Sequence, residues 1–270
     1  MDGGEKNEAH SEEAWMNTNG LYKLYAIVES EARKLRHDKT EVLTRSVQPI
    51  LWLLVFGEIF SQYKVIPTGG YGYLEFVAPG ILGQSVLFIS IFFGIMMVWD
   101  RESGVLSKIL VAPISRTSIV LGKALSAGVR GFAMAVVLMA VELVLGITFY
   151  PNILYTLAVF PVIVLLSALF ASLSIVIANL FRTRERVMGF GQLITMPLFF
   201  TSNALYPISI MPQWLQYISM VNPLSYGVDL LRSLLLTGNL SNLWLDLGVL
   251  FGYLLVFTVI GARLMRNILE

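Results

Sequence analysis

Long apolar runs alternate with short polar stretches along most of this 270-residue chain. Each of six runs is long enough to cross a bilayer, because a membrane-spanning helix needs about 20 mostly apolar residues. We therefore expect transmembrane helices over residues 43–62, 74–98, 118–149, 153–181, 187–206 and 243–264. Small residues that let helices approach closely recur in the third and fourth runs: Gly128, Gly131, Ser167, Ala168, Ala171 and Ser172.

Two segments precede the first run. Residues 21–40 place apolar side chains at helical spacing, with Lys and Arg largely off that stripe, which predicts an amphipathic helix in the membrane interface. The alternative is the first helix of a soluble subdomain, but the chain offers no other soluble sequence for it to pack on. Residues 1–20 are polar and acid-rich, so we expect a mobile cytosolic tail.

Composition supports an all-α integral membrane protein. Hydrophobic residues make up 56% of the chain and charged residues 14%, with a mean hydropathy of +0.72. The sequence has no Cys and only two His, His10 and His37, which excludes Cys-based sites and a His-rich metal centre. No paired carboxylates and no nucleophile–base pair stand out. We expect no catalytic site and no metal site.

The basic residues predict how the chain is oriented. All but three of the 19 Lys and Arg residues lie on one side of the six runs. The exceptions are Lys64 and Arg232 on the other side and Arg130 within the third run. Basic residues gather on the cytoplasmic side of a membrane protein. We therefore expect a multi-pass protein of the cell membrane with both termini in the cytoplasm.

The polar stretch between the second and third runs is WDRESGVLSKILVAPISR, residues 99–116. Leu106, Ile109 and Leu110 are spaced as one face of a short helix, and Pro113 ends it. So short a helix cannot bury its apolar face by itself. It either lies on lipid or inserts into a groove on a soluble partner.

The segment before the last run is apolar but interrupted by proline. Pro212 is expected to start one short helix, and Asn222 followed by Pro223 to begin a second as N-cap and first helical residue. Asp229 and Arg232 are three positions apart and can pair on the second helix. We predict a helical hairpin that enters the outer leaflet and returns.

Two motifs, RESGVLSKILVAPISR and VNPLSYGVDLLRSLL, resemble those of type-2 ABC transporter permeases, and the likeness in layout covers nearly the whole chain. The daunorubicin-resistance and nodulation-export branches look most similar. The resemblance implies a six-span permease domain over residues 43–270. It implies a coupling helix over residues 100–113, with these contact residues: Arg101, Glu102, Gly104, Leu106, Ile109, Leu110 and Pro113. It also implies an outer re-entrant hairpin: Pro212, Asn222, Pro223, Tyr226, Asp229 and Arg232.

The same resemblance implies the membrane subunit of an ATP-driven exporter, whose cargo would be an amphiphilic drug, a lipid or a glycan. The chain has no G-x-x-x-x-G-K-[ST] motif, so ATP and Mg are expected in a separate ATPase subunit. The expected assembly contains two permease copies and two ATPase subunits. It is surrounded by lipid and contains no nucleic acid. A stand-alone secondary transporter or channel is the alternative. The residues lining the substrate path stay unassigned.

Three charged residues fall inside the runs. Arg130 is placed near the cytosolic end of its helix, where it can snorkel to water. Glu142 and Glu58 are placed near outer ends, where a charge costs less than at the bilayer centre. We expect them to be interfacial residues, with a functional role for Glu142 as the alternative.

Overall fold

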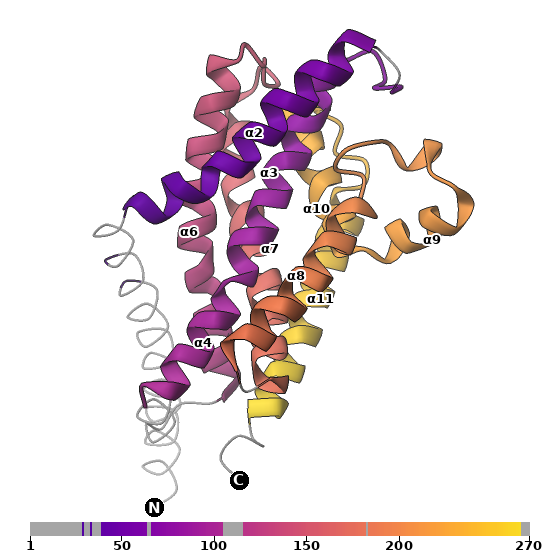
Figure 1. Ribbon diagram of the computed structural model, residues 1–270. Helices are drawn as coiled ribbons and strands as arrows, with labels where there is room; N and C mark the ends of the chain where they lie inside the picture. Colours follow the sequence, from indigo (N-terminus) through magenta and orange to yellow (C-terminus); the bar gives the residue numbers. More distant parts are fainter. Residues whose placement is uncertain are drawn as a thin grey trace, which may run out of the picture.

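The computed structural model of the chain describes Glu29, Arg33 and residues 39–63, 66–104, 116–181 and 183–265. Within these residues every regular element is a helix and no strand occurs, so the all-α prediction is confirmed. Figure 1 shows long helices bundled side by side, with α9 projecting from the bundle. The elements are α2 (Lys39–Tyr63), α3 (Tyr73–Ile91), α4 (Phe93–Glu102), α6 (Arg116–Val144), α7 (Ile153–Leu180), α8 (Arg184–Phe200), η1 (Ile208–Ile210), α9 (Gln213–Val221), α10 (Pro223–Arg232), η2 (Ser233–Thr237) and α11 (Leu243–Leu264).

Five stretches among the described residues are long and apolar enough to cross a membrane. They are Val42–Ser61, Tyr73–Glu102, Thr117–Val144, Ile153–Leu180 and Leu243–Leu264. The remaining predicted span, 187–206, corresponds to α8, which has 17 residues. A helix of that length rises about 25 Å, less than the ~30 Å of hydrocarbon. The chain is thus a membrane protein, whereas the count of six spans stays a prediction.

The third predicted span is too long at its C-terminal end. It was expected to reach residue 149, but α6 ends at Val144. Gly146 has a φ of 79°, a left-handed conformation that glycine adopts without strain. Its N–H donates to Leu143 O at 3.1 Å, and Ile147 N donates to Glu142 O at 3.0 Å. These two bonds form a Schellman motif, which ends the helix although the sequence continues to be apolar.

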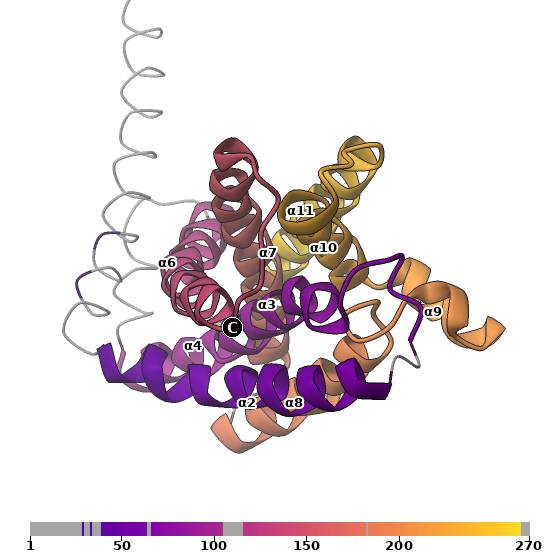
Figure 2. The same ribbon diagram turned by 90° about the horizontal axis from the view of Figure 1, so that it is seen from above.

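Helix α7 forms the centre of the bundle. It contacts α3, α4, α6 and α11, and Figure 2 shows these neighbours around it in a view from above. Glycines allow α6 to lie very close to α7. A Cβ added at Gly131 would lie 2.0 Å from Ser167 Oγ, and one at Gly128 would lie 2.9 Å from Val164 Cγ1. The close approach expected from the small residues is therefore confirmed.

The second span is broken between α3 and α4 by a side chain from α7. The Ser174 hydroxyl accepts a hydrogen bond from Gly94 N at 2.7 Å and donates to Ile91 O. A Cβ at Gly94 would lie 2.3 Å from this hydroxyl oxygen, so only glycine leaves room for it. A side chain inserted into the hydrogen-bond ladder is a recognised cause of a helix kink.

The two ends of the bundle are distinguished by the helices that end there. We call the end where α4, α7 and α11 end, at the bottom of Figure 1, the basal end. The opposite end, where α3 and α7 begin, is the distal end. Outward-facing apolar side chains lie between them, as lipid contact requires, among them Leu51, Val55 and Ile59 of α2 and Leu255, Val256 and Ile260 of α11.

Candidate functional site

The basal end carries a set of charged contacts that fix α4 to its neighbours. Asp100 forms an ion pair with Lys123 of α6. Arg101 donates to the carbonyl oxygen of Ala178 in α7 at 2.8 Å. Helix α4, whose residues 100–102 begin the predicted coupling helix 100–113, is therefore bound to both α6 and α7.

Glu102 of α4 forms an ion pair with Arg184 at the start of α8. Both side chains are more than 40% exposed, so water weakens the pair and its contribution to stability is at most about 1 kcal/mol. The Arg184 guanidinium also lies 5.0 Å from the ring centroid of Trp99. Glu102 thus has a partner within the chain, beside the partner-subunit contact predicted for it.

The described part of the coupling motif ends at Gly104. Its φ is 72°, and an added Cβ would meet no atom within 4 Å. Backbone conformation, and not crowding within the chain, is therefore the reason that glycine suits this position. Four predicted contact residues lie outside the described residues: Leu106, Ile109, Leu110 and Pro113. The same holds for nearly all of the predicted segments 1–20 and 21–40, of which Glu29 and Arg33 are described and form an ion pair at 2.7 Å.

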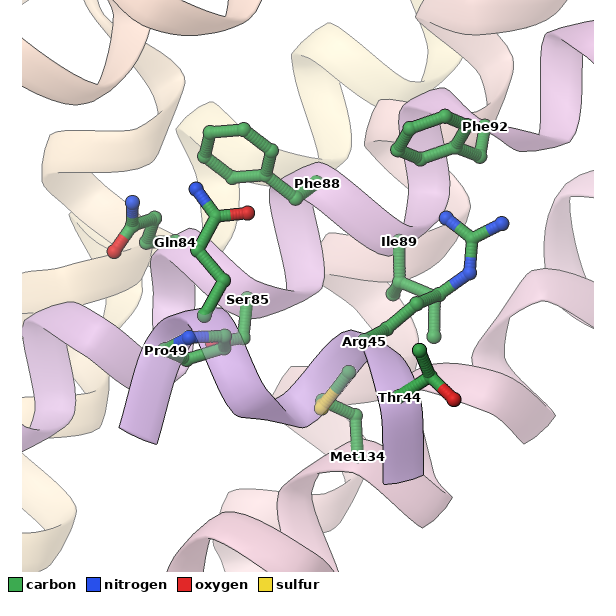
Figure 3. A pocket seen from close by; sticks show the side chains of 10 residues that line it. Thr44, Arg45, Pro49, Gln84, Ser85, Phe88, Ile89, Phe92 and Met134 are labelled. Atoms are coloured by element: carbon green, nitrogen blue, oxygen red, sulfur yellow. The ribbon is translucent and has the colours of Figure 1, made fainter. Parts of the chain in front are cut away.

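A pocket of about 190 Å³ opens between α2, α3 and α6. Figure 3 shows Gln84 at one end of it and the Arg45 guanidinium with the Phe92 ring at the other. Arg45 lies 4.2 Å from the centroid of that ring, a cation–π contact. The walls between the two ends are mainly apolar: Pro49, Phe88, Ile89 and Met134.

A second pocket of about 250 Å³ adjoins the first, because Arg45, Ile89 and Phe92 line both. Its other lining residues come from α4, α6 and α8: Phe93, Met96, Trp99, Arg130 and Met188. We call the two pockets together the α2–α3–α6 cleft. Its wall includes the break between α3 and α4, where Phe92 stands between the two helices.

Arg130 is buried inside the cleft wall and does not snorkel. Its exposure is 3%, and its guanidinium carbon lies 5.0 Å from the centroid of the Phe93 ring. The expectation of an interfacial arginine was wrong because position along a helix does not say which face the residue occupies. Arg130 lies one turn from Met134, on the face of α6 that packs inward.

Glu142 is buried as well, with 1% exposure. Neither of its carboxylate oxygens has a hydrogen-bond partner among the described residues. Glu142 lies near the end of α6, at the depth expected for it, but it faces the interior of the bundle. Glu142 follows Ala135 and Leu138 on the inward face of α6, so burial is imposed by the stripe on which it lies. Glu58, in contrast, is exposed.

The predicted outer hairpin contains α9, which follows Pro212, and α10. Asn222 lies between them and accepts from Leu224 N at 2.9 Å, with Pro223 as the first helical residue, as expected. The Asn222 amide also donates to Leu198 O at 2.6 Å and to Thr201 Oγ1 at 3.0 Å. The cap therefore joins α10 to the end of α8.

Tyr226 and Tyr253 fix the end of α9 from two sides. Tyr226 donates its hydroxyl to Met220 O at 2.5 Å. Tyr253 of α11 donates to Val221 O at 2.6 Å. The turn between the two short helices is thus held to the last helix of the chain.

Arg232 and Asp229 form the expected pair, 3.7 Å apart. Arg232 also donates to Asn203 O at 3.0 Å and lies 3.9 Å from the centroid of the Phe76 ring. Burial lowers the pKa of Arg232 to about 10, while the Asp229 carboxylate raises it, so the guanidinium stays charged at neutral pH. Asn203 Nδ2 donates to Asp229 at 2.5 Å. The predicted pair is thus part of a polar cluster between α10, α3 and residues 201–207.

Sequence reasoning did not find the α2–α3–α6 cleft. Three of its polar residues, Arg45, Gln84 and Arg130, come from three separate apolar runs. A signal was present in each run, since Arg45, Gln84 and Arg130 are all polar residues within mostly apolar sequence. Such a residue marks a face that turns away from lipid.

Comparison with known proteins identifies the family. Residues 22–236 match the ABC-2 type transporter family. The putative transport permease ycf38 of Cyanophora paradoxa is 30% identical over 261 residues, covering 93% of this chain and 90% of the relative. Nodulation protein J of Rhizobium leguminosarum bv. viciae is 26% identical over 84% of this chain and 86% of its own. The daunorubicin resistance ABC transporter permease protein DrrB1 of Streptomyces coeruleorubidus is 26% identical, over 86% of this chain and 82% of the relative.

The match covers most of the chain and includes every helix from α2 to α10. It agrees with the helical bundle and its five apolar spans. The chain belongs to the ABC-2 type transporter family of membrane permeases.

Proposed function

We propose that the chain is the transmembrane subunit of an ABC exporter that moves an amphiphilic drug, a lipid or a glycan out of the cytoplasm. A separate ATPase subunit supplies the energy and holds ATP and Mg. The observation that carries this proposal is family membership over residues 22–236. The printed name of the Streptomyces coeruleorubidus relative, an ABC transporter permease for daunorubicin resistance, supports both the ABC assignment and a drug-like cargo.

The proposed topology has six spans, a basal end in the cytoplasm and both termini there, in the cell membrane. Five spans rest on length and hydropathy. The sixth consists of α8 continued by the non-helical residues 201–206. Such backbone is tolerated at membrane depth where protein buries it. A Cβ at Gly80 of α3 would lie 2.2 Å from Ala204 O, and Tyr73 donates to Leu205 O at 3.1 Å, so this segment is closely covered.

The basal charges fit that orientation. Five basic residues lie near the basal ends of their helices: Arg101, Lys123, Arg184, Arg186 and Arg263. Basic residues near span ends favour the cytoplasmic side. The domain plan follows: a tail over residues 1–20, an interfacial helix over 21–40 and a permease domain over 43–270, with α9 and α10 dipping into the outer leaflet.

Force from the ATPase would enter through the predicted coupling helix, residues 100–113, which overlaps the end of α4. Arg101 and Asp100 hold α4 to α7 and α6, so a push on the segment moves three helices together. One chain carries one such segment, whereas ABC ATPases act as dimers. We therefore propose two permease copies and two ATPase subunits around a two-fold axis.

The test replaces both Leu106 and Ile109 by Ala. Truncating apolar side chains at an interface centre costs about 2 kcal/mol or more, so the variant should co-purify poorly with the ATPase and export nothing. Glu102→Gln is the matched control at the rim and should weaken binding mildly, in a salt-dependent way. The measurements are ATPase pull-down and ATP-dependent transport. Wild-type binding and export by the double variant would refute the coupling assignment.

A stand-alone transporter is the second candidate, favoured by one observation. Glu142 is buried in a span without a hydrogen-bond partner among the described residues, and such carboxyl groups often carry protons or ions in transporters. This candidate predicts transport that responds to an ion gradient and needs no ATP. Glu142→Gln would then abolish transport, whereas an ATP-driven exporter should retain it.

A further inference from the structure

We propose that the α2–α3–α6 cleft binds the cargo, and that the cargo is an amphiphile with an anionic group at one end and a hydrogen-bond donor farther along its chain. The inference rests on the proposed function in calling this ligand cargo. The binding site itself rests on three features of the cleft: its arginines, its apolar middle and a buried amide oxygen.

The anionic end of the ligand is inferred from two arginines that line the cleft. Arg45 and Arg130 both line the larger pocket, and no Asp or Glu is among the described residues that line either pocket. Each guanidinium has five N–H donors, so it can bind a carboxylate or phosphate in addition to its contacts within the protein. Arg130 is 97% buried, so less water screens its charge than at the protein surface.

The middle of the cleft favours a hydrocarbon chain. Phe88, Ile89 and Met134 form its walls, and the pocket surface they share is mostly apolar. Ligand pockets usually measure about 300–1,000 Å³. Each of the two pockets is smaller than this, at about 190 and 250 Å³, so a ligand of ordinary size must occupy both. It then passes Phe92, which lines the boundary between them.

The hydrogen-bond donor of the ligand is inferred from Gln84. This side chain is 3% exposed, and its Oε1 has no hydrogen-bond partner among the described residues. A buried acceptor left unpaired costs free energy, and a ligand hydroxyl or amide N–H would remove that cost. Gln84 lies two helical turns from Phe92 on α3, so this donor sits about 12 Å from the anionic group. Figure 3 shows Gln84 and Arg45 at opposite ends of the pocket.

The experiment measures binding of small probes to the full chain, purified with its ATPase subunit and held in nanodiscs of neutral phosphatidylcholine. The probes are decanoic acid with a terminal hydroxyl, decanoic acid, decanol and decyltrimethylammonium, at a pH at which the acids are ionised. Empty nanodiscs give the blank for partition into lipid. We expect the acids to bind, the hydroxy acid roughly fivefold more tightly than the plain acid, and the cation not to bind.

Variants then assign each end of the ligand. Arg45→Gln should weaken both acids about tenfold without changing decanol binding. Gln84→Leu should bring the hydroxy acid to the affinity of the plain acid, which itself stays unchanged. Arg263→Gln, an exposed basal arginine outside the cleft, is the control and should change nothing. Arg130 is buried and its loss could impair folding, so Arg45 and Gln84 carry the test.

Equal binding of decanol and the acids, or unchanged affinity in Arg45→Gln, would overturn the proposal. So would loss of acid binding when phosphatidylglycerol is added to the nanodiscs, because a resident acidic lipid would then be the occupant. Export is measured separately in vesicles with ATP. ATP-driven export without probe binding would refute the cleft as a binding site but leave the proposed function intact. Probe binding in a complex that hydrolyses no ATP would refute the function but keep the binding site.

Discussion

Replacing Ser174 by Ala removes the hydroxyl that holds the break between α3 and α4. Two backbone groups lose their partner: Gly94 N, which donates to Ser174 Oγ at 2.7 Å, and Ile91 O, which accepts from it. Ser174 is 1% exposed, so water does not replace these bonds readily. An orphaned buried backbone group costs about 1–3 kcal/mol. We therefore expect a loss of about 2–4 kcal/mol in the free energy of unfolding.

The matched control is Ser167→Ala on the same helix. Ser167 is equally buried, but its hydroxyl has no hydrogen-bond partner among the described residues, so its removal should change stability by less than about 0.5 kcal/mol. Thermal unfolding in nanodiscs compares the two variants. Hydrogen exchange of a peptide containing Gly94 gives the local readout, and exchange there should become faster in Ser174→Ala alone. If the two variants are equally stable and exchange alike, the hydroxyl does not hold the break.

Three further changes test other parts of the molecule. Asn222→Ala removes the cap of α10 and its bonds to α8, so the free energy of unfolding should fall by about 2 kcal/mol. Thermal unfolding measures this loss, and an unchanged melting temperature would contradict the hairpin geometry. Gly104→Ala forces a side chain into a left-handed conformation and should cost about 1 kcal/mol, whereas Gly104→Asn should be tolerated better. Arg232→Met should cost about 2 kcal/mol, and adding Asp229→Asn should restore part of it; additive losses would show that the two side chains do not interact.

Hydropathy predicted where most helices lie because a membrane span must be apolar along its whole length. It could not place helix ends where a local backbone motif decides. Gly146 ends α6 within an apolar sequence, and nothing in the hydropathy of residues 145–149 marks that position. Motifs of two or three residues predicted a helix start correctly at Asn222, because a side-chain cap and a following proline act locally there.

The candidate sites divide in the same way. The pairing of Asp229 with Arg232 follows from helical spacing and was predicted, whereas the contact of Arg232 with Phe76 depends on another helix. Arg130 and Glu142 were placed by their depth along a span, although the face of the helix decides their surroundings. That face could have been read from the neighbouring small and apolar residues. The cleft could not, because it exists only after three distant runs pack together.

The glycines that admit a neighbour's atoms also constrain how this sequence can diverge. Gly131 makes room for the Ser167 side chain, Gly94 for Ser174, and Gly80 for the backbone at Ala204. At Gly131, a larger residue in place of glycine can be accommodated only if the facing Ser167 becomes smaller. Substitutions there should therefore arise in correlated pairs across related permeases. At Gly94 and Gly80 no compensating substitution exists, because a carbonyl oxygen that every residue carries, that of Ser174 or of Ala204, also obstructs an added Cβ.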